Sequence, residues 1–292
     1  MRYPNGRGVF DVDFGVGKGQ VVGFLGPNGA GKTTTIRCLL GFMRGQTGQC
    51  TIDGRDCFTN APEIMKGVGF IAGEPAFPDG MDCLEYLNFL IQVRAAENKQ
   101  DKGFTERTKK RMNDLIEYFE LNPKGKIKKF SKGMKQKTAI VATFMHDPDV
   151  YILDEPTSGL DPLMQNRFVG LLLNEKKRGK TILISSHMFE EVERTADHVV
   201  IIKDGRIVVS DSIKNLKKAQ RKVFIVTTPD AKKIKTGGES KILSDTELEI
   251  SVPFDGIDKF LKELAKHTIT NIGVKEASLE DVFMTHYKGG TK

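Results

Sequence analysis

Residues 21–33 read VVGFLGPNGAGKT, and this segment constrains the fold more than any other feature of the sequence. Its second half matches the pattern G-x-x-x-x-G-K-[ST], whose glycines let backbone N–H groups converge on phosphate oxygens without a Cβ in the way. Val21–Leu25 is an apolar run of strand length, and Thr33–Leu40 has helical periodicity. The sequence therefore predicts a phosphate site between a buried strand and the positive end of a helix.

The phosphate loop supplies the first candidate ligands of a nucleotide. Lys32 should reach the β and γ phosphates, and the Thr33 hydroxyl should bind Mg²⁺. The predicted ATP-binding residues of the loop are Gly26, Pro27, Asn28, Gly29, Ala30, Gly31, Lys32, Thr33 and Thr34.

The rest of the chain alternates strand and helix patterns, which predicts an α/β fold with a largely parallel sheet. Val150–Leu153 and Thr181–Ser185 are further buried-strand candidates, and residues 199–209 around Asp204-Gly205 resemble a hairpin. Between Asp82 and Lys129 the sequence has helical periodicity and no strand candidates, which predicts a helical insertion in the α/β domain. The expected organisation is an α/β domain over residues 1–212, with a helical insertion at 82–147, a polar linker at 213–222 and a small α+β domain at 223–292, ending in a helix that a capping box begins at Ser278.

Composition narrows the class of protein. The chain has 292 residues with 39% hydrophobic content, enough for a packed core. No apolar run approaches the roughly 18 residues that a membrane helix needs, and the amino terminus lacks a signal-peptide pattern, so we expect a cytoplasmic chain. The net charge of +7 permits nucleic acid, an acidic protein or a membrane surface as a partner.

Two acids and a histidine are expected at the ligand-binding edge of the sheet. Asp154 and Glu155 follow the apolar run VYIL, and α/β sheets bind ligands at the carboxyl ends of their strands. Asp154 should contact Mg²⁺ directly or through water, and Glu155 could polarise an attacking water. His187 closes the strand TILISS and could bond the γ phosphate and Glu155; the other four histidines are interpreted as structural.

A second anion-seeking segment, FSKGMKQK, begins at Phe130 and precedes a helical pattern. Ser131 and Gly133 should therefore lie at a helix N-terminus. If the segment lies in the helical insertion, it is remote from the phosphate loop of its own chain. Two chains packed head to tail would each lend these residues to the nucleotide held by the other.

Together the segments GPNGAGKTT, FSKGMKQ, YILDEPTSGLD and SSH resemble the nucleotide-binding subunit of an ATP-binding cassette (ABC) transporter, over about residues 3 to 210. FSKGMKQ is similar to the family's signature motif, which gives Ser131, Lys132, Gly133 and Gln136 as contacts to the partner's nucleotide. Ser158 and Asp161 resemble its D-loop, and His187 its switch histidine. The variant signature and the C-terminal extension resemble the drug-resistance exporter branch.

The resemblance also implies residues where this sequence departs from the family. Tyr3 fits the aromatic that stacks on adenine, with a frayed terminal tyrosine as the alternative. The family's Mg²⁺-contacting glutamine is replaced by Gly73, followed by Glu74, which could accept a metal-bound water but cannot donate as an amide does. Phe77, Pro78 and Met81 could form a groove for a partner's helix, or pack locally.

The resemblance implies a Mg²⁺-dependent ATPase that powers export through a separate transmembrane permease. ATP would close a head-to-tail homodimer, and the protein would lie peripherally on the inner face of the cell membrane. No specific nucleic acid is expected. A soluble cassette ATPase acting on ribosomes or DNA is the alternative function, and a regulatory module without turnover is a third. The cargo is not encoded in this chain, because specificity lies in the membrane subunits.

Overall fold

The computed structural model describes residues 1–4, 6–219, 222–229, 231, 234, 239–253 and 256–275. The chain divides into two compact units, Met1–Ser210 and Asp211–Lys292. The division falls two residues before the boundary expected from the sequence. The predicted last helix after Ser278 lies outside the described residues.

A six-stranded sheet forms the centre of the first unit, in the order β4-β5-β6-β1-β7-β8. The strands are β1 (Val21–Leu25), β4 (Val68–Ile71), β5 (Val150–Asp154), β6 (Thr181–Ser186), β7 (His198–Lys203) and β8 (Arg206–Ser212). The pairs β4–β5, β5–β6, β6–β1 and β1–β7 are all parallel. The predicted parallel α/β sheet is therefore confirmed, and β7 is followed by its neighbour β8 after the two-residue turn Asp204-Gly205.

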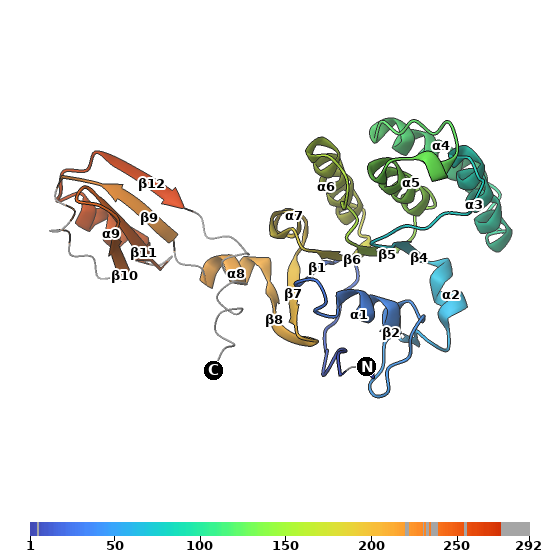
Figure 1. Cartoon of the computed structure of the whole chain (residues 1–292), viewed down its shortest axis with the longest axis horizontal. Coiled ribbons are helices and arrows are strands. Elements are labelled where there is room, and N and C mark those ends of the chain that lie inside the picture. Colours follow the sequence, from blue (N-terminus) through green and yellow to red (C-terminus); the bar gives the residue numbers. More distant parts are fainter. Residues whose placement is uncertain are drawn as a thin grey trace. The chain divides into compact units, whose positions relative to one another are not determined.

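Helices cover both faces of this sheet, which explains why its central strands β1, β5 and β6 are almost entirely buried. Helix α1 (Lys32–Leu39) lies on one face, and α6 (Pro162–Lys177) and α7 (Phe189–Thr195) lie on the other (Figure 1). All five residues of β1 are buried. Phe24 points to the same side as Ile36 of α1 and shares its core cluster.

The segment between β4 and β5 forms three long helices that gather on one side of the sheet (Figure 1). These are α3 (Cys83–Glu97), α4 (Phe104–Tyr118) and α5 (Lys132–Phe144), with the 3-10 turn η1 (Ile127–Lys129). A capping box between Asp82 and Glu85 begins α3. No strand is assigned in this segment, all of which is described, so it has the helical character expected for 82–147.

Shorter elements complete the first unit. They are β2 (Thr51–Ile52), β3 (Arg55–Asp56) and α2 (Ala61–Lys66). Ahead of β1, the described residues contain only an isolated bridge between Arg2 and Gly8.

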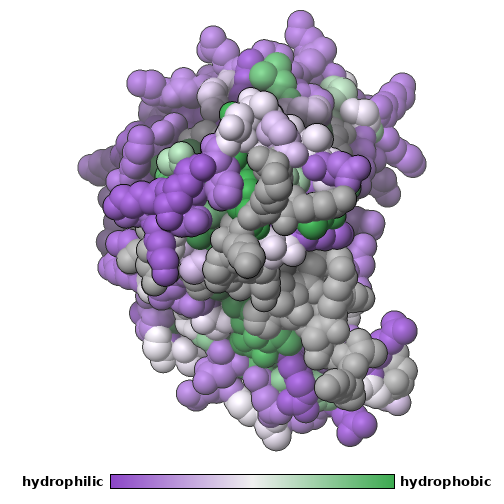
Figure 2. Space-filling model, turned by 90° about the vertical axis from the view of Figure 1, so that its left-hand side faces the viewer, coloured by the Kyte–Doolittle hydropathy of each residue, from purple (hydrophilic) through white to green (hydrophobic). Residues whose placement is uncertain are grey.

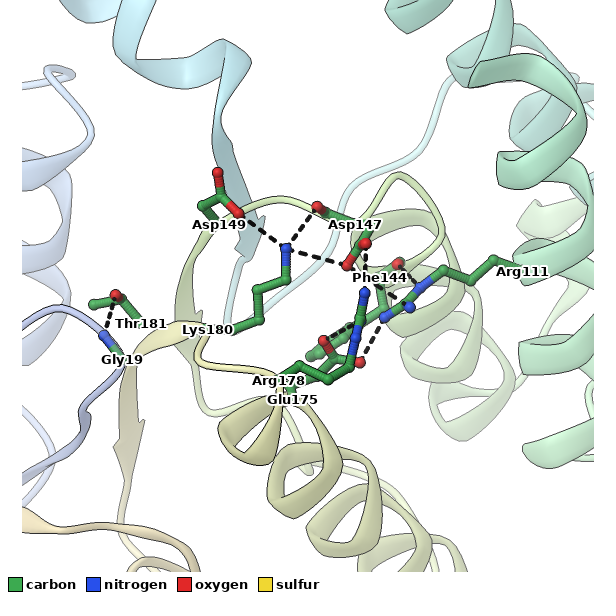
Figure 3. A network of polar contacts seen from close by, with 9 residues as sticks. All are labelled: Gly19, Arg111, Phe144, Asp147, Asp149, Glu175, Arg178, Lys180 and Thr181. Atoms are coloured by element: carbon green, nitrogen blue, oxygen red, sulfur yellow. Dashed lines mark hydrogen bonds and ion pairs between the residues drawn. The ribbon is translucent and has the colours of Figure 1, made fainter. Parts of the chain in front are cut away.

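A network of charged side chains joins the helical insertion to the sheet at the amino ends of β5 and β6 (Figure 3). Glu175 of α6 accepts hydrogen bonds from Arg111 of α4 at 2.5 Å and from Arg178 at 2.7 Å. Arg178 also bonds Asp147, at 2.5 Å, and Lys180 bonds the carbonyl oxygen of Asp147 at 3.1 Å. Because Arg111 also donates to the last carbonyl of α5, at Phe144, three helices are tied together at this point.

The second unit contains an antiparallel sheet in the order β10-β11-β9-β12 and two helices among its described residues. The elements are α8 (Ile213–Ala219), β9 (Lys222–Thr227), β10 (Glu239–Ile242), β11 (Glu247–Val252), α9 (Ile257–Leu264) and β12 (Asn271–Lys275). Phe224 packs on Phe260 of α9 with ring centroids 4.7 Å apart. Helix α8 occupies the segment for which the sequence predicted a polar linker.

Hydrophilic residues dominate the coloured part of one face of the molecule (Figure 2). Among the coloured residues of the face drawn in Figure 2, most are hydrophilic and the hydrophobic ones form small groups. None of the helices in the described part of the chain has an apolar stretch long enough to cross a membrane.

Candidate functional site

The phosphate loop connects β1 to α1 at the carboxyl edge of the sheet. Gly29 and Gly31 have φ values of 81° and 116°, a region that favours glycine. A Cβ on Gly31 would lie 2.5 Å from a methyl group of Val9, so the close approach also requires glycine. The buried Lys32 ammonium donates to the Gly26 carbonyl at 2.6 Å, which curls its side chain back over the loop. The loop therefore holds the Lys32 ammonium against the carbonyl oxygens of Gly26 and Pro27.

Asp154 and Thr33 meet although they lie far apart in the sequence. The Thr33 hydroxyl donates to Oδ2 of Asp154 at 2.9 Å, and the Ser185 hydroxyl donates to Oδ1. The Thr33 hydroxyl oxygen and the Asp154 carboxylate oxygens are ligand types that Mg²⁺ prefers. Mg²⁺ commonly takes only one or two carboxylates, and water and substrate phosphates complete its coordination. The described residues contain no cluster of three or more His, Cys, Asp or Glu that could hold a metal ion by themselves. The site thus fits a Mg²⁺ ion bound together with a phosphate.

Glu155 lies at the centre of the predicted catalytic group. Its Oε2 is 2.5 Å from Nδ1 of His187, and its Oε1 is 3.5 Å from the Lys32 ammonium but accepts no hydrogen bond. The residue has a left-handed backbone, with φ 48°, and its amide donates to the Ser185 carbonyl at 3.1 Å. Its carboxylate therefore has one oxygen bound to histidine and one oxygen that faces the Lys32 ammonium without a hydrogen bond.

The position next to Asp154 is occupied by Gly73. A Cβ on Gly73 would lie 3.7 Å from Oδ2 of Asp154, whereas Glu74 is exposed. The sequence offered Glu74 as a metal ligand. In the structure Gly73 is the residue that lies beside the carboxylate of Asp154.

Tyr3 reaches the helix that follows the loop. Its hydroxyl lies 3.3 Å from the Thr34 hydroxyl and 3.7 Å from the sulfur of Met43, and its ring is half-buried. The residue is thus held against α1, contrary to the alternative of a frayed terminus.

The predicted signature segment begins α5. Ser131 is its N-cap, and its hydroxyl accepts from the Met134 amide at 3.2 Å. A Cβ on Gly133 would lie 2.9 Å from the Gly159 carbonyl, and a Cβ on Gly159 would meet the side chain of Lys132 at 2.8 Å. The start of α5 and the turn after Glu155 are therefore in close contact within one chain.

Two more residues define that turn. Asp161 caps α6 by accepting from the Met164 amide at 3.0 Å, and Ser158 donates its amide to the Glu155 carbonyl at 3.1 Å. The Gln136 side chain is fully buried and donates to the Pro156 carbonyl at 2.6 Å. It was predicted to contact a nucleotide on a second chain; instead it braces α5 against the turn, because it lies on the inward face of the helix.

The sequence did not single out Glu191 of α7. Its carboxylate accepts from the hydroxyls of Thr157 at 3.2 Å and Ser186 at 3.0 Å. Burial raises the pKa of Glu191, the two hydroxyl hydrogen bonds lower that pKa, and the nearby Glu155 charge raises it. Its position four residues after His187 was the only feature of the sequence that could have pointed to Glu191. Helical spacing alone does not distinguish Glu191 from the adjacent Glu190.

Comparison with known proteins gives a consistent result. A family model described as ABC transporter matches residues 9–158. The chain is 33% identical to the bacitracin transport ATP-binding protein BcrA of Bacillus licheniformis, over 99% of this chain and 95% of that protein. It is 29% identical to a fluoroquinolones export ATP-binding protein of Mycobacterium tuberculosis, over 97% of this chain and 89% of that protein.

Solved structures are also similar. One, described as the ATP-binding subunit of an ABC transporter, has a TM-score of 0.64 and 31% identity, covering 72% of this chain and 85% of that chain. Another is a dimeric, post-hydrolysis ATP-binding cassette bound to ADP and Pi, with a TM-score of 0.61 and 19% identity over 70% of this chain and 90% of that chain. At this level of identity, the likeness to the dimeric cassette supports the fold alone.

Proposed function

This chain belongs to the ABC transporter family as an ATP-binding, ATP-hydrolysing subunit, and we propose that two copies of it power export of a cargo through a separate membrane subunit. The observation that carries the proposal is the meeting of Lys32, Thr33, Asp154, Glu155 and His187 at one edge of the sheet. These residues come from three strand ends, so the arrangement depends on the whole fold.

Each of these side chains has a proposed role. Lys32 exchanges its bond to the Gly26 carbonyl for the β and γ phosphates of ATP. Thr33 and Asp154 hold Mg²⁺, which supplies charge neutralisation at the phosphates when bound. Glu155 orients the attacking water and takes its proton, with His187 holding Oε2 so that Oε1 is turned to the water. Tyr3 is the proposed stacking surface for adenine.

Association of two chains is proposed to complete the site. Ser131 and Gly133 lie at the N-terminus of α5, a helix of 13 residues, where free backbone N–H groups suit an anion. The contact of Lys132 and Gly133 with the turn at Gly159 supports a surface that a second copy could meet head to tail. ATP between the copies would close the pair, and hydrolysis would open it.

The proposed surface for the membrane subunit lies on α3 and the loop before it. Leu84, Phe89 and Val93 of α3 are exposed hydrophobic side chains. Phe77 of the loop packs edge-on against Tyr86, with ring centroids 5.3 Å apart, so this loop is anchored to the same helix. Binding there would keep the chain peripheral on the inner face of the membrane. The relatives named for transport and export favour this function over a soluble cassette acting on ribosomes or DNA.

The test is the Glu155→Gln variant, purified with MgATP from gently solubilised cells. We expect turnover to fall about 10²- to 10⁴-fold, since general-base catalysis contributes that much, while ATP still binds and a stable dimer accumulates. A multi-helix membrane protein should co-purify. Wild-type turnover would refute the role of Glu155, and co-purification of RNA or soluble proteins alone would refute the transport role.

A further inference from the structure

Helix α7 carries a buried carboxyl group to which the chemistry above gives no role. Glu191 is 5% exposed, whereas the adjacent Glu190 is exposed. Its Oε1 is buried and accepts no hydrogen bond. Burying a carboxyl group in this way costs free energy, so its contacts need an account.

Both hydrogen-bond donors to the Glu191 carboxylate are hydroxyl groups, and they come from two different segments of the chain. Thr157 comes from the turn after β5, and Ser186 is the last residue of β6. The Ser186 oxygen in turn accepts from the Met188 amide at 2.9 Å. Every bond of the Ser186 hydroxyl therefore has a defined direction, which fixes the start of the segment that carries His187.

These contacts form a closed ring with the proposed catalytic pair. Thr157 lies two residues after Glu155, and Ser186 lies directly before His187. The Glu155–His187 contact thus joins the same two loops as Glu191 does. One link carries the proposed chemistry, and the other fixes how far apart the two loops lie.

We propose that Glu191 is a positioning residue for the Glu155–His187 pair, acting through the hydroxyls of Thr157 and Ser186. The inference rests on the proposed catalytic roles of Glu155 and His187. It also gives a route for coupling, because the Thr157 carbonyl accepts from the Leu160 amide at 3.0 Å in the turn that leads to Asp161. A second chain that moves this turn would move the loop of His187 through Glu191.

The first measurement is the ATPase kinetics of Thr157→Val and Glu191→Ala. Thr157→Val replaces the hydroxyl by a methyl group of similar size in a buried site, so it tests the bond with least risk to folding. We expect kcat to fall about 10- to 100-fold, the effect of small misplacements of catalytic groups, with KM for ATP little changed. Glu191→Gln should retain most of the activity, since its amide oxygen can accept from both hydroxyls. Glu190→Gln is the matched control and should behave as wild type.

The deciding measurement repeats Thr157→Val in a His187→Ala background. If Glu191 acts through the pair, Thr157→Val should have no further effect on kcat there, whereas a purely structural role would give independent, multiplying losses. Multiplying losses, or a wild-type kcat for Thr157→Val alone, would overturn the inference. Wild-type turnover in His187→Ala and Glu155→Gln would instead refute the catalytic assignment itself, so the two failures are distinguishable.

Discussion

The two ends of strands β5 and β6 carry charged groups that are arranged in opposite ways. At the amino ends, the carboxylates of Asp147 and Glu175 are each matched by guanidinium or ammonium groups (Figure 3). At the carboxyl ends, Asp154 accepts only from neutral hydroxyl groups, and Glu155 contacts His187 and, at 3.5 Å, the Lys32 ammonium. Carboxylates bound by several guanidinium and ammonium groups stabilise the fold, whereas a carboxylate held only by hydroxyl groups, such as Asp154, keeps its charge available to a bound cation.

Two buried glutamates show the contrast most directly. Glu175 is 2% exposed and both of its oxygens accept from arginines. Glu191 is 5% exposed, and its donors are neutral hydroxyls on only one oxygen. Burial is therefore equal, and the partners decide what each residue can do: the first ties helices together, and the second connects the loops of the proposed catalytic pair.

Glu175→Gln should break the amino-end network with the largest effect on stability. Removing this charge weakens two charge-assisted hydrogen bonds of a buried side chain and leaves Asp147 as the remaining acidic partner of Arg111 and Arg178, so the free energy of unfolding should fall by about 3 kcal/mol. Chemical denaturation measures this, with kcat per folded molecule as the second readout. Glu120→Gln, which removes the exposed partner of Arg167, is the control. If Glu175→Gln kept full stability but lost turnover, the network at the amino ends of β5 and β6 would serve catalysis rather than the fold, contrary to our assignment.

His146 makes the same end sensitive to acid. Burial, helped by the Arg94 charge, lowers the pKa of His146 to about 4. The fold thus favours the neutral imidazole, so this contribution is complete above the usual pKa near 6.5 and is lost as pH falls through about 4, by up to about 3 kcal/mol. Unfolding curves at several pH values should show less acid destabilisation in His146→Gln than in the wild type. His267→Gln, in the second unit, should not reduce it; equal acid sensitivity in His146→Gln would refute the assignment.

The sequence predicted those elements whose structure depends on residues close together in the chain. The phosphate loop was readable because glycine spacing, a buried strand and a helix all agree within residues 21–40. The strand ends at Asp154 and His187 followed from the rule that parallel strands gather their carboxyl ends at one edge. In the structure Thr33 bonds Asp154 and His187 bonds Glu155 at this edge.

Contacts that depend on packing could not be read in the same way. Gln136 was expected to point toward a second chain, yet it lies on the buried face of α5, which the polar motif around it conceals. Glu191 was missed because nothing in the sequence separates it from Glu190 before the fold places one inside and one outside. The basic, polar composition of residues 213–222 predicts a linker, but such composition does not exclude a short helix, and Ile213–Ala219 is helical.

Asp154→Asn makes the carboxylate-to-amide change at the opposite end of β5. Because Asp154 is held by hydroxyls, its charge contributes little to the ligand-free fold, and we expect the free energy of unfolding to change by no more than about 1 kcal/mol. The rise in Tm that MgATP produces should shrink, because a proposed ligand of the metal is lost. Thermal unfolding with and without MgATP tests both statements. A loss of stability like that of Glu175→Gln would show that both ends serve the fold alike.

Asp149→Asn should have the smallest effect and separates burial from mere contact. Asp149 accepts from Lys180 at 3.0 Å, but its side chain is 92% exposed, so solvent screens the pair. Lys180 also keeps the Asp147 carbonyl and carboxylate as partners. The expected loss in free energy of unfolding is below about 1 kcal/mol and should diminish further in high salt. If Asp149→Asn instead matched Glu175→Gln, the number of ion pairs rather than their burial would determine the strength of this end of the sheet.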